Sequence, residues 1–437
     1  MDVAVIGTGH VGVVTCVSLA SMGHRVVGTD RDAEKIALLS DGRVPFHEPG
    51  VEDLLHDELD GGRLSFTVDP GEALAKAAVV LISVGTPPRA AGDANLVAVE
   101  AAAQTVARHA TRRCAVVEKS TVPTGTASRL RRALERENGK ATKLEVVSNP
   151  EFLREGHAVH DALHPDRILV GADSQWARKT MRRLYAPLVE GGAVLVETDI
   201  ASAELAKHAC NAFLALKISF SNALARLCER SGADVEVVTE VMGMDPRIAP
   251  GMLKAGIGFG GSCFPKDLMA FRRLASALGY DFPLLDEISR INDQAVDAVV
   301  DKVRDALWNL EGKTVALWGL AFKPGTDDVR FAPSLALARR LISEGARVIG
   351  YDPQAAANSK SEVPELEIAP DPYEAAAGAH CLVVCTQWEE FSGLDLERIR
   401  ATMTYPIVVD GRNLFDPEQM RRAGFAYYPT GRPSITT

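Results

Sequence analysis

Val3-Ala-Val-Ile-Gly-Thr-Gly-His-Val-Gly12 joins a short apolar run to three glycines spaced as Gly-x-Gly-x-x-Gly. The apolar run is typical of a buried parallel strand, and an apolar segment suited to a helix continues to Met22. A second apolar run, residues 25–29, ends at Asp30, which lies 18 residues past the third glycine. This order of strand, glycine loop, helix, strand and acid predicts a Rossmann-type domain that binds a dinucleotide.

Each glycine of this loop has a separate expected task. Gly7 allows a tight turn, Gly9 lets the backbone approach a pyrophosphate, and Gly12 permits close packing of helix on strand. Asp30 would accept hydrogen bonds from ribose hydroxyls and repel a 2′-phosphate, which favours NAD over NADP. The neighbouring Arg31 argues the other way. A glycine-rich turn without a ligand is the alternative interpretation.

Polar turns follow two further predicted strands, residues 78–84 and 114–118. Ligands of open parallel sheets bind beyond the carboxyl ends of the strands. We therefore expect Gly85, Thr86, Ser120 and Thr121 near the nicotinamide end of a bound NAD. Apolar runs at 146–148 and 167–171 predict additional strands, and the first domain is predicted to span residues 1–196.

The middle of the chain has a helical pattern. Residues 201–230 contain no proline and have apolar positions at helical spacing, which predicts a long central helix. Lys207 and Asn211 are four residues apart and share one face of this helix. The predicted helical domain spans residues 197–305 and is a candidate for subunit contact.

A glycine loop interrupts that helical region at Gly258-Phe-Gly-Gly-Ser-Cys-Phe-Pro-Lys-Asp267. Pro265 suits the first turn of a helix, so Cys263 is expected at a helix N-terminus with Lys266 and Asp267 close by. The helix dipole and a nearby ammonium group favour thiolate over thiol. The pattern indicates a nucleophile, with a buried and inert cysteine in a glycine-rich turn as the alternative.

The last third repeats the first. Gly345-Ala-Arg-Val-Ile-Gly-Tyr-Asp352 echoes Gly23-His-Arg-Val-Val-Gly-Thr-Asp30, and strands are predicted at 313–319, 381–385 and 407–410. The first turn of this copy lacks the glycine fingerprint and carries Lys323 and Arg330 instead. Such cations suggest a different phosphate-bearing ligand, while a duplicated domain kept only for packing is the alternative. The predicted fold is α/β, with two Rossmann-like doubly wound parallel-sheet domains (1–196 and 306–437) joined by the long helix and the helical middle domain.

Composition narrows the class of protein. The chain has 437 residues, 46% of them apolar, and a formal net charge of −10, which argues against nucleic acid but not against an anionic small molecule. No apolar run approaches the roughly 18 to 20 residues of a membrane span. The seven cysteines and ten histidines show no metal-ligand or redox spacing, so we expect no metal. A strand-like N-terminus without a basic leader and the scattered cysteines favour a reducing cytoplasm.

These motifs together resemble those of the UDP-glucose/GDP-mannose dehydrogenase family, over residues 1 to about 430. The motifs that carry the resemblance are Gly7 to Gly12, Val84-Gly-Thr-Pro, Lys119-Ser-Thr-Val-Pro, Asn149-Pro-Glu-Phe-Leu-Arg-Glu-Gly156, Lys207 with Asn211, Gly258 to Asp267, Phe322-Lys323 with Thr326-Asp-Asp-Val-Arg330, and Asp410-Gly-Arg412. The resemblance implies NAD-dependent oxidation of the C6 alcohol of a nucleotide sugar to a carboxylate. Two NAD+ would be consumed per turnover without release of an aldehyde.

The resemblance also implies catalytic roles. A water held by Thr121 and Asp267 would take the C6 hydroxyl proton, and Cys263 would attack the aldehyde, so that the second hydride transfer leaves a thioester. Lys207 and Asn211 would stabilise oxyanions, and Glu151 would activate the hydrolytic water. By spacing alone, Glu151 and Glu155 fit an exposed helical turn equally well.

Ligand contacts follow from the same resemblance. Arg247 would reach into the site of a partner subunit, which implies a homodimer, and Lys323 and Arg412 would meet the nucleotide diphosphate or sugar. The residues expected to bind NAD are Gly7, Gly9, His10, Val11, Gly12, Asp30, Lys35, Gly85, Thr86, Ser120, Thr121, Glu155 and Arg330. Those expected to bind the nucleotide sugar are Glu151, Phe152, Leu153, Arg154, Lys207, Asn211, Arg247, Gly260, Cys263, Phe264, Lys266, Phe322, Lys323 and Arg412.

The chain departs from the family pattern at three places. It has Arg330-Phe-Ala-Pro333 where Arg-Glu-Ser-Pro is common, Asn222-Ala223 where Asn-Glu is usual, and His10 where tyrosine is common. Residues 149–156 and His164-Pro-Asp-Arg167 resemble the UDP-glucose branch most. The same chemistry on dTDP-glucose or GDP-mannose remains an alternative, as do a nucleotide-binding protein without activity and a hydroxy-acid dehydrogenase.

Overall fold

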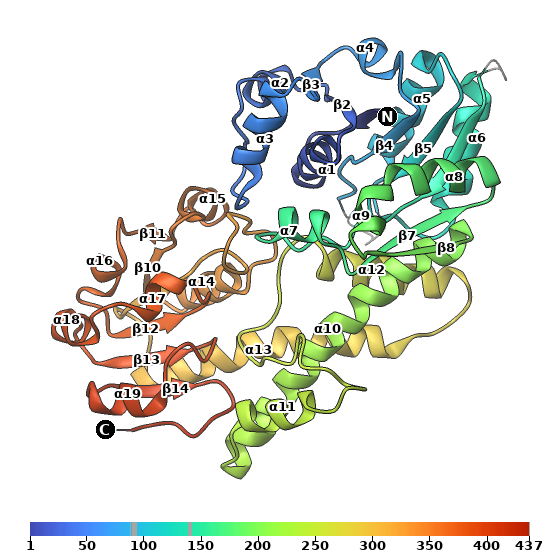
Figure 1. The fold of residues 1–437 in the computed structure, drawn as a ribbon. Helices are drawn as coiled ribbons and strands as arrows, with labels where there is room; N and C mark the ends of the chain where they lie inside the picture. The colour runs from blue at the N-terminus through green and yellow to red at the C-terminus, as the bar shows by residue number, and fades with distance from the viewer. Residues whose placement is uncertain (88, 90–93, 139–141, 437) are drawn as a thin grey trace. The chain divides into compact units, whose positions relative to one another are not determined.

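The computed structural model describes residues 1–87, 89, 94–138 and 142–436. They form two compact units, the first made of Met1–Cys210 and Met269–Tyr280, the second of Asn211–Leu268 and the described residues from Asp281 onward. Two of the three unit boundaries fall inside helices, α10 (Ile200–Ser231) and α12 (Phe264–Ala277), and the third falls between α12 and α13 (Pro283–Leu307). Figure 1 labels these helices. The division into three domains at residues 196 and 305 stays a prediction.

The first unit is built on an eight-stranded sheet in the order β3-β2-β1-β4-β5-β6-β7-β8. Its first six strands have the order of a dinucleotide-binding sheet. Neighbouring strands are parallel except β6 and β7, which pair antiparallel. The strands are β1 (Asp2–Ile6), β2 (Arg25–Thr29), β3 (Leu64–Thr67), β4 (Val79–Ile82), β5 (Cys114–Glu118), β6 (Leu144–Ser148), β7 (Arg167–Ala172) and β8 (Val194–Thr198).

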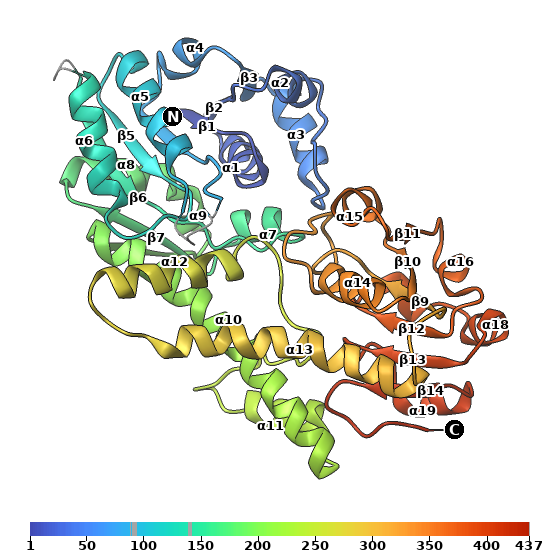
Figure 2. The same ribbon diagram turned by 180° about the vertical axis from the view of Figure 1, so that it is seen from behind.

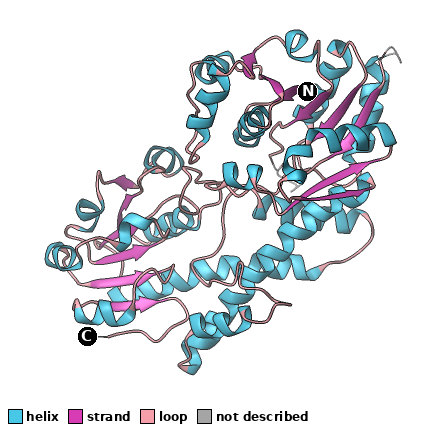
Figure 3. Cartoon of the chain, viewed as in Figure 1, coloured by secondary structure: helices cyan, strands magenta, loops and turns pink. Residues whose placement is uncertain are grey.

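Alternate side chains of these strands pack into two separate cores. Val3 and Val5 point to one face of the sheet and Ala4 to the other, which is why the central strands are largely apolar. Helices α1, α3, α7 and α8 contribute to the first core, and α4, α5 and α6 to the second, so helices cover both faces (Figure 3). The helices of this unit are α1 (His10–Ser21), α2 (Ala33–Ser40), α3 (Val51–Asp60), α4 (Pro70–Leu74), α5 (Val97–His109), α6 (Thr126–Asn138), α7 (Ala158–Leu163), α8 (Gln175–Leu184) and α9 (Ala186–Glu190).

The second unit contains a six-stranded parallel sheet in the order β11-β10-β9-β12-β13-β14. Helices α13 and α14 pack on one face, and α16 to α19 pack on the other. The strands are β9 (Thr314–Trp318), β10 (Arg347–Tyr351), β11 (Glu367–Ile368), β12 (Cys381–Val384), β13 (Ile407–Asp410) and β14 (Ala426–Pro429). The helices beyond α10 are α11 (Val235–Gly243), α12, α13 (Pro283–Leu307), α14 (Pro333–Ser343), α15 (Ala356–Glu362), α16 (Pro372–Ala376), α17 (Glu389–Ser392), α18 (Leu396–Thr402) and α19 (Pro417–Arg422).

Local sequence explains where several helices begin. Helices α4, α16 and α19 each start with an Asp-Pro pair, in which the aspartate side chain accepts a backbone hydrogen bond and proline has the first helical dihedral already set. Within the second unit, α13 passes across α10 where the Ser219 hydroxyl donates to the Ile288 carbonyl at 2.8 Å (Figure 2).

The structure confirms the predicted fold class and differs from it in detail. The central helix, predicted at 201–230, is observed at Ile200–Ser231. Strands β3, β8, β11 and β14, all at sheet edges, were not predicted, and β3 and β8 are partly exposed and lack a buried apolar run. The antiparallel pairing of β7 was not predicted either. Among the helices within the described residues, none is long and apolar enough to cross a membrane.

Candidate functional site

The glycine loop of the first unit has the close contacts that its sequence requires. Gly7 has a φ of +92°, a conformation that side chains rarely allow. A Cβ at Gly12 would lie 1.9 Å from the Gly7 carbonyl oxygen, so any side chain there would separate α1 from the turn. A Cβ at Gly9 would meet nothing within 4 Å, and α1 begins at the next residue. The loop therefore leaves open space at a helix N-terminus, which fits the pyrophosphate of NAD.

Asp30 directly follows β2 and is a charged hydrogen-bond acceptor. Its Oδ2 accepts from the Thr8 N–H at 2.9 Å and from the Lys35 ammonium at 3.2 Å, and its Oδ1 accepts from the Asp32 N–H. Burial works against ionisation, but these hydrogen bonds and the lysine charge outweigh it and lower the pKa of Asp30. A carboxylate at this point suits ribose hydroxyls and opposes a 2′-phosphate.

His10 is held by a residue that the sequence did not single out. Its Nε2 lies 2.7 Å from Glu48 Oε2, and the Glu48 carboxylate also accepts from the Gly156 and Ala158 N–H groups at 2.6 and 2.8 Å. Glu48 thus connects the glycine loop to the end of the 149–156 motif and to the start of α7. Nothing in its sequence position reveals this role.

The turns after β4 and β5 are bound to each other. The Thr86 hydroxyl donates to the Thr121 carbonyl at 2.9 Å, and the Ser120 hydroxyl donates to the Val84 carbonyl at 2.7 Å. A Cβ at Gly85 would meet nothing within 4 Å. Four residues predicted to bind NAD therefore share one surface at the carboxyl end of the sheet, beside open space.

Glu151 and Lys207 form a buried ion pair in the first unit. Lys207 Nζ lies 3.2 Å from Glu151 Oε1, and Glu151 Oε2 accepts from the Leu153 N–H at 2.5 Å. The Phe152 ring lies 5.3 Å from Lys207 Nζ. Glu151 is buried in a non-helical segment, so the alternative of an exposed helical turn is wrong for it. Arg154 is exposed and pairs with Asp161.

Lys119 lies near this pair, and the sequence predicted no role for it. Its Nζ donates to Asn149 Oδ1 at 3.2 Å, and the Tyr185 hydroxyl donates to the same oxygen at 2.5 Å. Burial lowers the pKa of Lys119 to about 8, with Glu151 opposing the shift and Lys207 adding to it. The only sequence signal for Lys119 is its place at the head of the Lys-Ser-Thr-Val-Pro motif.

Cys263 directly precedes α12 in the second unit, as predicted. The Asp267 N–H donates to the Cys263 carbonyl at 2.9 Å in the first turn of that helix. The buried Asp267 carboxylate accepts from Asn211 Nδ2 at 2.5 Å and from Lys266 Nζ at 2.8 Å. A half-buried thiol, a carboxylate, an ammonium and an amide are thereby brought to one helix start.

The cysteine loop tolerates no side chains at its glycines. A Cβ at Gly260 would lie 2.4 Å from the Phe331 carbonyl oxygen, and one at Gly261, where φ is +79°, would lie 2.7 Å from the Phe322 ring. The Gly261 N–H donates to the Arg330 carbonyl at 2.8 Å. Backbone contact with the 322–331 loop therefore fixes the segment that carries Cys263. Phe264 packs edge-on against Phe259.

The predicted cations of the second unit differ in their surroundings. Arg412 is partly enclosed, donates to the Cys385 carbonyl at 2.8 Å, and has its pKa lowered to about 10 by burial. Lys323 Nζ lies 5.5 Å from the Phe322 ring. Arg330 pairs with Asp328 and Arg247 with Asp245, both at the surface. Arg330 was predicted to contact NAD, and this contact stays a prediction.

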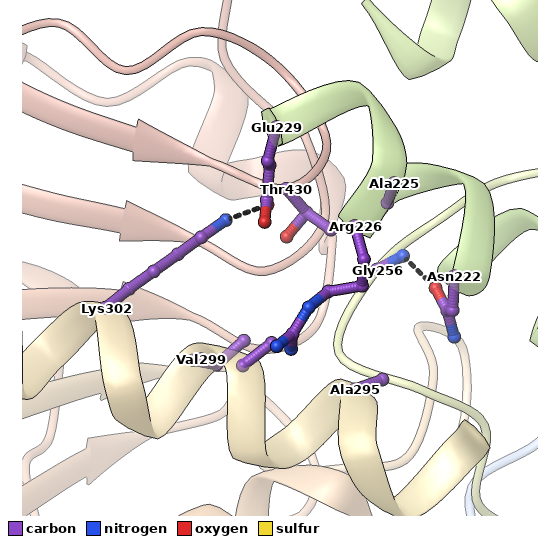
Figure 4. A pocket seen from close by; sticks show the side chains of 10 residues that line it. Asn222, Ala225, Arg226, Glu229, Gly256, Ala295, Val299, Lys302 and Thr430 are labelled. Atoms are coloured by element: carbon purple, nitrogen blue, oxygen red, sulfur yellow. Dashed lines mark hydrogen bonds and ion pairs between the residues drawn. The ribbon is translucent and has the colours of Figure 1, made fainter. Parts of the chain in front are cut away.

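A small cavity of about 10 Å³ also lies in the second unit (Figure 4). Within it, Lys302 extends to Glu229 and Asn222 accepts from the Gly256 N–H at 2.8 Å. The buried Asn222 Nδ2 has no hydrogen-bond partner among the described residues, so a water would be well placed there. No residue predicted to bind the nucleotide sugar lines this cavity. It is therefore separate from the candidate catalytic groups.

Five of the six predicted catalytic residues thus form two groups, one in each unit, while Thr121 lies in the turn after β5 of the first unit. The first unit brings together Glu151 and Lys207, and the second brings together Cys263, Asp267 and Asn211. Lys207 and Asn211 are one turn apart on the continuous helix α10. Within the described part of the chain, no group of three or more His, Cys, Asp or Glu side chains could hold a metal ion.

The first unit combines a dinucleotide-binding glycine loop with Asp30, an acid suited to the ribose, and the chain also carries a cysteine at a helix start. These features together define an NAD-dependent dehydrogenase. The chain belongs to the UDP-glucose/GDP-mannose dehydrogenase family. The NAD-binding domain of that family matches residues 1–189, its central domain residues 201–294, and its UDP-binding domain residues 316–417.

Named relatives agree with this membership. A UDP-glucose 6-dehydrogenase of Pseudomonas aeruginosa is 44% identical over 99% of this chain and 98% of the relative. One of Rhizobium meliloti is 44% identical over 99% of this chain and all of the relative. The solved UDP-glucose dehydrogenase of Pyrobaculum islandicum is 39% identical and superposes with a TM-score of 0.92 over 99% of this chain and 98% of that one. The chain is accordingly an NAD-dependent nucleotide-sugar dehydrogenase.

Proposed function

We propose that this enzyme oxidises the C6 alcohol of UDP-glucose to the carboxylate of UDP-glucuronate through a covalent Cys263 intermediate. The observation that carries the proposal is the arrangement of Asp267, Asn211 and Lys266 around the start of the helix that follows Cys263. The substrate is inferred from the relatives, which bear the name UDP-glucose 6-dehydrogenase. NAD, when bound, supplies the hydride acceptor for both oxidations.

The first oxidation needs a proton acceptor for the C6 hydroxyl. Asp267 is buried, and its two oxygens accept from Asn211 and Lys266, so its carboxylate is held in one orientation. We propose that a water held by Asp267 and Thr121 receives this proton. The aldehyde is not released, because the Cys263 thiolate attacks it in the same active site.

The second oxidation requires a covalent bond to sulfur. The Cys263 thiolate attacks the aldehyde carbon, and the resulting thiohemiacetal loses hydride to become a thioester. Lys207 and Asn211, one turn apart on α10, stabilise the oxyanions of these steps. Water activated by Glu151 then hydrolyses the thioester, which releases the acid and restores the thiol. Each sugar acid therefore requires two NAD+.

The second unit supplies the expected contacts to the nucleotide. Arg412 and Lys323 would meet its negative charges, and Phe322, Gly260 and Phe264 would line the sugar side. Arg412 is preorganised because its Nε is already held by the Cys385 carbonyl and its backbone N–H by Asp410. The 149–156 segment, with Phe152, Leu153 and Arg154, would complete the contacts from the first unit.

We also propose a homodimer, because the second unit exposes an apolar stripe. Phe213, Phe220 and Leu227 follow one another at seven-residue intervals on α10 and are 62%, 48% and 61% exposed. The following helix, α11, adds exposed Val237 and Val241. Such a continuous apolar face marks a contact with another protein surface. Arg247, which follows α11 with its side chain 87% exposed, would enter the partner's site.

A substrate panel tests the proposal. UDP-, dTDP- and GDP-hexoses are each incubated with NAD+, and NADH formation is followed alongside sugar-acid formation. We expect UDP-glucose to give the highest kcat/KM, with two NADH per acid and no aldehyde trapped by a hydrazine. A preference for dTDP-glucose or GDP-mannose would overturn the substrate assignment. One NADH per product would overturn the four-electron reaction.

A further inference from the structure

Glu118 is a buried acid that the proposed chemistry does not use. It is the last residue of β5, immediately before the 119–125 segment that carries Lys119 and Thr121. The residue is 1% exposed, and neither carboxyl oxygen has a hydrogen-bond partner among the described residues. A carboxylate without water or a donor is costly, because desolvation disfavours the charge. Its surroundings must therefore supply a reason for its presence.

The carboxyl group of Glu204, on α10, is close enough to interact with that of Glu118. Glu204 is 3% exposed, and its two oxygens accept from the Gly125 N–H at 2.6 Å and the Ala127 N–H at 2.8 Å. Helix α6 begins at Thr126, between these two donors. Glu204 therefore caps the N-terminus of α6, where a negative charge is stabilised by the helix dipole.

Two adjacent carboxylates cannot hydrogen-bond to each other, since neither carries a donor. A single proton converts the contact into a strong hydrogen bond and removes the repulsion between like charges. The proton belongs on Glu118, because Glu204 already accepts two N–H groups while Glu118 accepts none. We propose that Glu118 and Glu204 are positioning residues that share one proton, and that this pair fixes the 119–125 segment against α10.

Neighbouring contacts support a positioning role. His208, one turn after Glu204, donates from Nε2 to the Val122 carbonyl at 2.8 Å, so α10 holds the segment at a second point. Three charged groups on the surrounding elements have partners of their own: Lys119 contacts Asn149, Lys207 pairs with Glu151, and Arg131 of α6 pairs with Asp173. The segment between the two attachment points contains Thr121. Only the role of Thr121 rests on the proposed function.

The pair has a definite pH dependence. Burial, and then the charge and contact of Glu204, raise the pKa of Glu118 well above its usual value. The folded protein therefore binds a proton that the unfolded chain releases once the pH exceeds the usual range of glutamate. Because the folded state holds more protons, stability falls as the pH rises from that range toward the raised pKa of Glu118.

The variant Glu118→Gln isolates this effect, since its amide donates to Glu204 at every pH. We expect Glu118→Gln to keep NADH formation within about threefold of wild type at neutral pH, a change worth under 1 kcal/mol. Its melting temperature should decline less than that of wild type between acidic and alkaline buffer. The matched control is Glu135→Gln, on the exposed side of α6, which should keep the wild-type decline. An unchanged decline in Glu118→Gln would overturn the shared proton.

Two further measurements test the pair, and the first of them does not depend on the reaction. The difference between the infrared spectra of wild type and Glu118→Gln at neutral pH should contain the carbonyl stretch of one protonated carboxyl group, and a difference spectrum without it would overturn the assignment. Glu118→Ala, if folded, should lower kcat about tenfold to a hundredfold through misplacement of the segment, with rescue in Glu118→Gln. Equal rates in Glu118→Ala and wild type would overturn the positioning role. Failure of the substrate panel would leave the melting and infrared results standing.

Discussion

Cys263 differs from most other cysteines of this chain in its surroundings. Burial raises the pKa of Cys16, Cys114, Cys381 and Cys385, and these thiols serve as small apolar core residues. Cys263 is only half-buried and stands directly before the first turn of α12. A reactive thiol needs access and a local positive potential, and this position supplies both.

Replacing Cys263 should therefore stop the second oxidation. In Cys263→Ala and Cys263→Ser, we expect net turnover to fall by about three orders of magnitude or more, because alanine has no nucleophile and a serine hydroxyl is far harder to ionise than a thiol. Binding of substrate and NAD should persist in calorimetric titrations. Cys210→Ala is the matched control, because Cys210 is the other half-buried cysteine. Sugar-acid formation by Cys263→Ala at more than about a tenth of the wild-type rate would make the thiol a bystander.

Asp30 should determine the choice between NAD and NADP. Its carboxylate is charged and held by Thr8 and Lys35, so a 2′-phosphate would meet repulsion there. We expect kcat/KM for NAD to exceed that for NADP by at least about tenfold, or about 1.4 kcal/mol. Asp30→Asn should narrow the ratio while the Thr8 contact is kept. Equal values for wild type would indicate that Arg31 dominates the ribose pocket.

At the scale of elements, the sequence predicted those features that depend on residues close together along the chain. Buried strands and the long helix α10 have clear apolar periods, and the start of α12 after Cys263 follows from Pro265 and the glycines. Edge strands β3 and β8 lack a run of buried apolar residues and were not predicted. Pairs such as Glu118 with Glu204 join residues far apart in sequence, so no spacing rule reveals them.

The cysteine loop offers a test of close packing. Gly260→Ala would place a methyl group 2.4 Å from the Phe331 carbonyl, which is backbone and cannot rotate away. We expect the free energy of unfolding to fall by about 1 to 3 kcal/mol, the usual range for overpacking, with a lower melting temperature in calorimetry. Gly251→Ala is the control, since its Cβ would meet nothing within 4 Å. If the two variants melt together, the loop does not depend on this contact.

At the scale of the whole molecule, the exposed apolar stripe of α10 is the surface that a subunit contact would cover. Phe213, Phe220 and Leu227 lie at a spacing close to two helical turns, so they share one face of the helix. A second copy of the same helix is the simplest surface that matches this stripe, since a two-fold axis pairs a patch with itself. In the proposed dimer, Arg247, exposed beyond α11, would be available to the partner's active site.

Subunit complementation tests this arrangement. Arg247→Ala should lose affinity for the sugar nucleotide while keeping that for NAD, and Cys263→Ala should be inactive. If Arg247 acts in the partner's site, a purified heterodimer of the two variants contains one complete site of two and should recover about half the wild-type activity. The two variants carry different affinity tags, so that tandem purification isolates the heterodimer.

The control heterodimer combines Arg247→Ala with the double variant Arg247→Ala/Cys263→Ala. It has no source of the arginine and only one Cys263, so it should stay at about half the residual activity of the Arg247→Ala homodimer. Recovery only in the first heterodimer would require an arginine from the other chain, because its chain with an intact Cys263 lacks Arg247. A first heterodimer no more active than the control would place Arg247 in its own subunit's site. A fully active monomer in sedimentation would remove the dimer altogether.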